Sequence, residues 1–598
     1  ALQPGRVRRF ADAPAGLHPP PMLSARLARR LRFGPRAAVA AGPCSSAAAQ
    51  FVSPPAGWYS VDSHVHVQQC PGVTGKVPPN LTLEEVYQLQ QAGNLDVAFV
   101  LLRNSLVSAL GQELYFQDFA PLITGLEESV TQPDADHEIR YGFEVSGFPA
   151  QDLGHIHAIG VTSGFFPNLS WPGPILDWLE SGAAGPDPLI GYAHVRWHEG
   201  LPPLAIGQIA HTGSELGIVH SALGRIDFVE ASFLDPIETL GPLVLYEGLL
   251  ATGLRTSLIG GSDNSCLALP IGGIRSFVQT GGASLSFDEL LDGIREGRTT
   301  TSIGGEVFLG MELNGARMGE DALLEAGEPA TLKPDIHVLE AFEGVLEIRR
   351  NGVPISSSPF SAQPGQDPFP DGIAIDVPES AFITARVLGP KGVVSHAFAS
   401  AIYALVDRQP IASGTLAQYW RSILLQMIAE VDYFDQLPAE DSAALVVELR
   451  DAVTVLNAYL ALADDPPATV ERLGHSTNWA CRGPLAMGVT GPVSQGTAGF
   501  AFTCVNAPDN ASGLLAVSTG TVPAGASLIS GITAFIDSPL VLVPVQANAG
   551  GYASWSPSIP AVAIGLTFSG QFVFDHTQGC GVPGQLAASD ALVFQIVP

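Results

Sequence analysis

The sequence predicts a multidomain protein in which a distorted α/β barrel is followed by a β-sandwich, a helical hairpin and a second β-sandwich. Its 598 residues exceed what one hydrophobic core usually serves, since domains typically contain about 100–200 residues. Hydrophobic residues make up 46% of the chain and charged residues 14%, which argues against wholesale disorder. The pattern of apolar residues changes along the chain, and these changes set the boundaries of the expected domains.

The first folded region spans residues 57–304, where short apolar runs alternate with helical stretches. One helical stretch covers residues 82–93, with Thr82 as its N-cap and Gly93 as its stop. Strands and helices in alternation imply a mainly parallel sheet or barrel. The apolar runs that we interpret as buried strands are 95–102, 154–161, 190–195, 226–232 and 256–263.

Three further regions follow the first one. Residues 305–405 alternate apolar and polar side chains around Gly, Asn and Pro turns, which predicts an immunoglobulin-like β-sandwich. Residues 410–470 repeat apolar residues at steps of three and four, which predicts a helical hairpin. Residues 475–598 are rich in Gly, Ser, Ala and Val and predict a C-terminal β-rich domain, again a sandwich.

Residues 1–50 predict a leader or a disordered segment. From Met22 a basic stretch precedes Ala- and Val-rich residues and a small-residue ending, an order that resembles a secretion signal. The chain has six cysteines and no CxxC pair, which fits an exported protein with one or two disulfides, with unpaired buried thiols as the alternative. We therefore expect a secreted, periplasmic or cell-envelope protein. One disulfide and one odd thiol are expected among Cys481, Cys504 and Cys580.

The overall charge limits the classes of partner. Acidic residues outnumber basic ones 58 to 28, and the formal net charge of −30 repels nucleic acid and anionic lipid. The chain also lacks the run of about 20 apolar residues that a membrane span needs. The expected partner is a small molecule, with phosphorylated compounds among the candidates because metal ions can attract an anion locally.

The segment WYSVDSHVHVQQC at residues 58–70 carries the most informative motif. On a strand, residues at i and i+2 project to the same face, so His64 and His66 point together. Two neutral imidazoles on one face form a natural chelating pair for zinc, iron or manganese, and Asp62 is placed to orient one ring. The alternative is a pair of ordinary surface or core histidines.

Other metal-binding side chains recur downstream, each at or near the end of a predicted strand. Clustering of this kind favours a common site, because strand ends meet at one edge of a barrel. These residues are Glu144 in YGFEVSG, His155 and His157 in DLGHIHAIG, His194 and His198 in GYAHVRWHEG, and Asp263 in LIGGSDNSC.

Taken in order, HxH, a Glu before a GHxxAxG strand, AH and GSD resemble the PHP (polymerase and histidinol phosphatase) superfamily. The segment from Leu291 to Gly304, with its GRT triplet, is similar to the CehA/McbA-like branch of metallohydrolases. The resemblance covers residues 57–304 and the β-sandwich that follows. It implies a distorted (β/α)7 barrel and a metal-dependent hydrolase, most often a phosphoesterase that uses a metal-activated water.

The resemblance also implies a set of site residues and a divalent metal cofactor, Zn, Mn or Fe, with one or two ions. Glu144 would bridge two ions. Independently of the resemblance, His157 or His198, outside the ligand set, is a candidate to transfer the proton. Glu230 matches a Glu of the family whose role is open. The implied metal ligands are His64, His66, Glu144, His155, His194 and Asp263.

Two departures from the family pattern put a full metal site in doubt. The family's TDHN becomes LLRN at residues 101–104, and its SDxH becomes SDNS, with Ser265 in place of the His. Arg103 then becomes a candidate fixed cation for a phosphate or carboxylate, or forms a salt bridge to a loop carboxylate. The alternative function is a catalytically degenerate, secreted binding or envelope protein.

Cys70 and Cys266 each follow a metal motif and are expected to form a disulfide, or to remain thiols or metal ligands.

Overall fold

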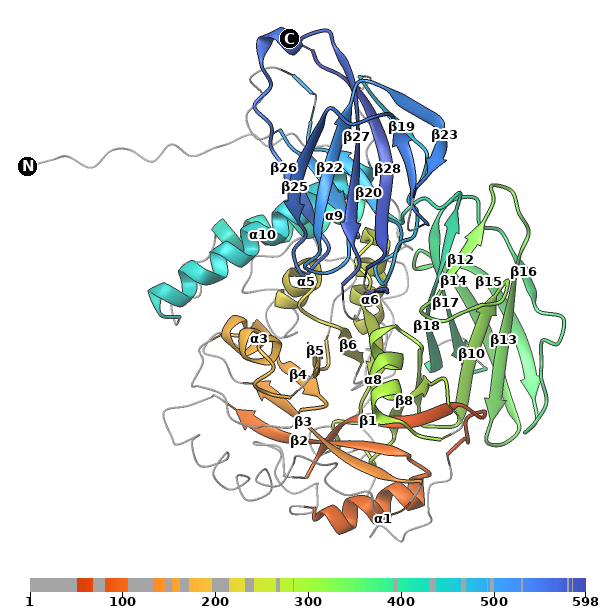
Figure 1. Cartoon of the computed structure of the whole chain (residues 1–598). Coiled ribbons are helices and arrows are strands. Elements are labelled where there is room, and N and C mark those ends of the chain that lie inside the picture. The colour runs from red at the N-terminus through yellow and green to blue at the C-terminus, as the bar shows by residue number, and fades with distance from the viewer. Residues whose placement is uncertain are drawn as a thin grey trace, which may run out of the picture. The chain divides into compact units, whose positions relative to one another are not determined.

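The structure is a computed structural model and is mostly β (Figure 1). Strands hold 42% of the described residues and helices 22%, with seven α-helices in that part of the chain. The described residues are 51–67, 81–105, 134, 136–146, 153–161, 171–185, 187–195, 215–231, 241–264, 269–282, 284–390, 395–429, 437–463, 469–491, 493–494, 500–528, 531–577, 580–582 and 584–597.

The predicted (β/α)7 barrel is not borne out: the described residues are mostly β, and the first nine strands belong to one large sheet of mixed strand direction. This sheet has 14 strands, and most follow the order β15-β14-β17-β18-β9-β8-β1-β2-β3-β4-β5-β6-β7. Its first nine strands are β1 (Trp58–His66), β2 (Val97–Ser105), β3 (Glu138–Ser146), β4 (Ile156–Ile159), β5 (Leu189–Tyr192), β6 (Phe228–Ala231), β7 (Ser257–Gly260), β8 (Ile274–Gln279) and β9 (Thr299–Ile303).

The directions of the strands explain both the error and the position of the site. Strands β1, β2 and β3 are parallel, β4 is antiparallel to β3 and to β5, and β5, β6 and β7 are parallel again. Strands β8 and β9 are antiparallel to their neighbours as well. Consequently the C-terminal ends of β1, β3, β5, β6 and β7 and the N-terminal end of β4 lie at the same edge of the sheet.

Five helices accompany these strands: α1 (Leu83–Gly93), α3 (Gly173–Glu180), α5 (Glu215–Ala222), α6 (Gly241–Thr252) and α8 (Phe287–Arg295). Thr82 caps α1 as predicted, and Glu85 completes a capping box by accepting a hydrogen bond from the Thr82 backbone. Asn94, in the left-handed conformation, ends the helix just after Gly93.

Residues 307–406 form two packed sheets around a common apolar core, which includes Leu309, Leu346 and Ile383. One is the four-stranded sheet β11-β10-β13-β16, and the other is the end of the large sheet, because β18 pairs with β9. The strands are β10 (Val307–Leu313), β11 (Ala316–Arg317), β12 (Asp321–Leu324), β13 (Ala330–Val338), β14 (Phe342–Arg350), β15 (Val353–Ala362), β16 (Ile373–Ile375), β17 (Ala381–Leu388) and β18 (Ser395–Val406).

Two helices follow, α9 (Gly414–Ala429) and α10 (Ala439–Ala463), and they share a core that includes Trp420 and Leu456. None of the helices in the described ranges is long and apolar enough to cross a membrane.

The C-terminal strands form sheets of five, three and two strands. The expected disulfide is confirmed between Cys481 and Cys580, and Cys504 is a buried free thiol. These strands are β19 (Val470–Leu473), β20 (Ala486–Val489), β21 (Phe502–Val505), β22 (Ser512–Ser518), β23 (Thr521–Ser527), β24 (Thr533–Ile536), β25 (Val541–Gln546), β26 (Ala553–Trp555), β27 (Thr567–Asp575) and β28 (Leu586–Gln595).

Candidate metal centre

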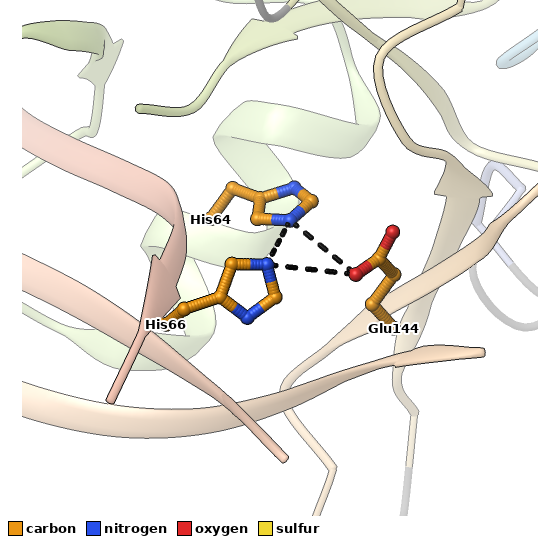
Figure 2. Close-up of side chains that lie close together, drawn as sticks. All are labelled: His64, His66 and Glu144. Atoms are coloured by element: carbon orange, nitrogen blue, oxygen red, sulfur yellow. Dashed lines mark hydrogen bonds and ion pairs between the residues drawn. The ribbon is translucent and has the colours of Figure 1, made fainter. Parts of the chain in front are cut away.

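A first group of donors, His64, His66, Glu144 and Asp263, forms where β1, β3 and β7 end. The Nε2 atoms of His64 and His66 lie 3.0 Å apart. Glu144 Oε2 is 3.7 Å from His64 Nε2 and 3.6 Å from His66 Nε2, so the three side chains point toward one another (Figure 2). Asp263 Oδ1 lies 3.1 Å from His66 Nε2 and 3.7 Å from His64 Nε2.

A second group of donors consists of Glu144, His155 and His194. The other oxygen of Glu144, Oε1, lies 2.6 Å from His155 Nδ1 and 3.1 Å from His194 Nε2. The two ring nitrogens are 3.2 Å apart. His155 just precedes β4 and His194 follows β5, so the reversed direction of β4 brings both to the edge where β3 ends. Glu144 therefore belongs to both groups.

Two further carboxylates, Glu230 and Asp62, contact residues of the first group without belonging to it. Both oxygens of Glu230, on β6, lie 3.0 Å from His64 Nδ1, and Oε2 lies 2.5 Å from His157 Nδ1. Asp62 was expected to orient a histidine ring. Instead it accepts hydrogen bonds from the backbone amides of His64, Ser262 and Gly272. Asp62 thus ties β1 to the segments after β7, and Glu230 is the carboxylate on the ring.

The two groups differ in their access to solvent. The side chains of His64 and His66 are 0% and 1% exposed, and that of Glu144 is 3% exposed. In contrast, His155 and His194 are 31% and 23% exposed. The first group is therefore closed, and the second group faces the side from which a small molecule can arrive.

Charge and burial oppose each other strongly in this cluster. Burial by itself raises the pKa of Glu144, but its histidine neighbours, His155 foremost, hold the pKa well below the usual value. Burial lowers the pKa of His64, yet Glu230 and Asp263 raise it well above the usual value. In the absence of a cation these shifts keep Glu144 ionised and His64 protonated, and a metal ion would take the place of the proton on His64, because ligands must be deprotonated.

The backbone is distorted where it presents two of these side chains. His194 and Asp263 have φ angles of 34° and 42°, in the left-handed region that non-glycine residues seldom adopt. Strand β1 shifts register against β2 between Asp62 and Val65, next to the histidine pair. Such strain and bulges persist where the surrounding structure holds them, and they concentrate at functional sites.

Among the described residues, several donor atoms of the two groups lack a hydrogen-bond partner or face another donor atom, an arrangement that a bound cation would satisfy. Asp263 Oδ1 is buried and accepts no hydrogen bond within the described part of the chain. Unsatisfied buried acceptors are rare in folded proteins. Two pairs of imidazole nitrogens face each other at 3.0 Å and 3.2 Å, and in each pair a metal ion can satisfy both lone pairs. These buried His and Glu side chains can therefore hold a metal ion.

Gly261 controls how closely the end of β7 approaches the histidine strand. A Cβ atom at this position would lie 2.4 Å from His64 Cβ and 2.8 Å from Ser63 Oγ, so both segments would have to move. We expect Gly261→Ala to lower any metal-dependent hydrolysis about 100-fold, since a shift of about 1 Å at a reacting site has that effect. Gly281→Ala, where a Cβ meets no atom within 4 Å, is the matched control. Equal activity in the two variants would contradict this role for Gly261.

The structure brings the six expected ligands into one cluster, with Glu144 at its centre. His157 joins the cluster behind Glu230, where its ring is 0% exposed. The backbone of Arg103 is part of β2, and its side chain lies outside the described residues, as do His198, Ser265, Cys70 and Cys266. From the sequence, Glu230 had only a match to a family Glu of open role, because its contact with His64 depends on how distant strands are arranged.

Comparisons with known proteins add no assignment to this geometry: no family model and no curated protein matches the sequence.

Proposed function

We propose that this chain is a metal-dependent hydrolase with a PHP-like active site, acting on phosphoesters in preference to carbamates and other esters. The observation that carries the proposal is the division of the Glu144 carboxylate, whose Oε2 faces His64 and His66 and whose Oε1 faces His155 and His194. A carboxylate shared in this way supports two neighbouring ions, one in each donor group.

The donor types favour particular ions. Imidazole nitrogens combined with carboxylate oxygens suit zinc, manganese and iron, which are the ions that we propose. When bound, such an ion polarises an ester or phosphoryl oxygen and lowers the pKa of water toward neutrality. The closed first group supplies four protein donors. The second supplies three and is open to solvent, as catalytic sites generally are.

Local charge favours an anionic substrate in spite of the acidic composition. Two divalent ions would add four positive charges, against three negative charges from Glu144, Asp263 and the adjacent Glu230. The remainder of one positive charge attracts a phosphate group, because bound ions dominate the local field. The disulfide between Cys481 and Cys580 supports an oxidising compartment as the place of this activity.

The test is metal analysis of the purified full chain, followed by assays on a panel of aryl phosphates and carboxylic esters. We expect about one to two ions per chain and hydrolysis that a chelator abolishes and added metal restores. His64→Ala should lose both the bound metal and the hydrolysis. His220→Gln changes another fully buried histidine, which contacts Tyr192 and Glu448 instead of the cluster, and should keep both.

Two outcomes would contradict the proposal. A full chain that binds no zinc, manganese or iron has no metal centre at all. A chain that binds metal and hydrolyses no compound of the panel favours the degenerate binding protein instead.

A further inference from the structure

Three fully buried side chains from separate strands meet in a row behind the first donor group: His64 on β1, Glu230 on β6 and His157 on β4. Glu230 stands in the middle. Its carboxylate oxygens lie 3.0 Å from His64 Nδ1, and Oε2 lies 2.5 Å from His157 Nδ1. His64 belongs to the first donor group and His157 was a candidate for proton transfer, but the proposed hydrolysis gives Glu230 no task.

The protons of the row follow from these distances. A ring nitrogen that approaches a carboxylate oxygen this closely must carry a proton, because two lone pairs would repel each other. His64 therefore carries a proton on Nδ1, which leaves Nε2 as the ring atom that a metal ion can bind. That atom is the one directed at His66 and Glu144, while Nδ1 lies on the far side of the ring (Figure 2).

His157 ends the row. Its contact with Glu230 is an ion-pair contact outside hydrogen-bond geometry, and its Nε2 is buried with no hydrogen-bond partner among the residues that the structure describes. The ring also packs edge-on against Phe228, with centroids 5.3 Å apart. A proton shuttle needs an exit toward solvent or substrate, and this ring has none on the described side chains.

We propose that Glu230 and His157 are positioning residues for the metal centre: Glu230 fixes the tautomer and the orientation of His64, and His157 holds Glu230 in place. This inference rests on the proposed metal site. Carboxylates that orient a histidine ligand in this manner raise its basicity, and their loss typically weakens metal binding 10–100-fold.

A different arrangement would make the row itself a ligand set. His64, His157 and Glu230 each offer an atom within 4.8 Å of the others, which is close enough for an additional ion. His64 would then have to give both ring nitrogens to metal ions. Because Nδ1 already faces both Glu230 oxygens at 3.0 Å, the geometry favours a proton over an ion at that position.

The experiment measures Co²⁺ binding to the metal-free full chain by competition with a chelating dye, together with the visible absorption of the bound Co²⁺. The variants are Glu230→Gln, His157→Gln and the double variant. Glu138→Gln serves as the control, because Glu138 is a buried carboxylate on β3 that pairs with Arg140 instead of the cluster. Circular dichroism checks that each variant is folded.

We expect Glu230→Gln to weaken the tighter Co²⁺ site about 10–100-fold, with the number of ions at saturation unchanged and the visible bands shifted. His157→Gln should have a smaller effect in the same direction. The double variant should bind no more weakly than Glu230→Gln, since His157 acts through Glu230. The control variant Glu138→Gln should keep the wild-type Co²⁺ affinity and visible bands. This result would show that loss of a buried carboxylate does not by itself weaken the metal site.

Other results would overturn the inference. Equal affinity in Glu230→Gln and the wild type, with metal bound in both, removes the positioning role and leaves the metal site intact. Loss of one whole ion in His157→Gln identifies the row as a ligand set. A wild-type chain without any bound Co²⁺ overturns the proposed function, and this inference with it.

Discussion

Glu144→Ala is expected to empty both metal positions in one step. Glu144 is the single residue that contributes to both donor groups, through Oε2 in one and Oε1 in the other. A structural zinc site with about four donors binds with roughly 10–16 kcal/mol, so each donor supplies about 3 kcal/mol. Loss of that amount weakens each position about 100-fold, and hydrolysis should fall below detection.

Metal content after dialysis against a weak chelator measures this effect. A second substitution tests whether the two oxygens of Glu144 serve different ions. Glu144→Gln keeps one carbonyl oxygen, so it can serve only one of the two positions and should retain at most one ion. Glu138→Gln on the same strand should retain the wild-type content. If Glu144→Ala kept one ion at full affinity, Glu144 would belong to one group alone and the shared centre would be disproved.

Glu247→Ala is expected to cause the largest loss of stability outside the metal centre. Glu247 on α6 receives a two-pronged contact from Arg349 on β14, with Nε and Nη2 at 2.8 Å and 2.9 Å, and a hydrogen bond from Thr384. The two charged side chains are 7% and 12% exposed. Removing one partner of a buried pair costs about 3–5 kcal/mol, because Arg349 stays buried with Glu347 as its remaining counterion.

The corresponding fall in the midpoint of thermal unfolding is roughly 6–20 °C for a domain of about 150–250 residues. Glu247→Leu combined with Arg349→Met should recover most of it, since an apolar pair avoids the desolvation cost. Glu320→Ala, which removes an exposed partner of Arg317, should change the stability by less than about 1 kcal/mol. A midpoint for Glu247→Ala that matches this control would show that the pair contributes little.

The ligand residues of the candidate site could be predicted from the sequence, because residue type and spacing are enough to identify them. His64 and His66 are two residues apart on one strand, and Glu144, His194 and Asp263 each stand where an apolar run ends. Local signals were equally reliable, as in the capping box of Thr82 and Glu85. Such features need no knowledge of which strands pair.

The parts that sequence reasoning missed depend on pairing between distant segments. The apolar run 156–159 is the same whether its strand is parallel or antiparallel, so the reversal of β4 and the mixed strand directions of the large sheet could not be read from it. The partners of Glu230 and Asp62 were unpredictable for the same reason. A buried carboxylate is visible in the sequence, but the ring or amide that it meets comes from another strand.

The pairing of β9 with β18 has a practical consequence for anyone who wishes to study the metal-binding region alone. Residues 300–302 pair with residues 397–399, and Thr299 Oγ1 lies 2.7 Å from Ser400 Oγ. A fragment cut after residue 304 would leave β9 with a row of unpaired amides and carbonyls, the kind of bare strand that invites other chains to add to it. Isolation of the region with the candidate metal site would thus expose an aggregation-prone strand edge that β18 covers in the intact chain, so the two regions are better expressed together.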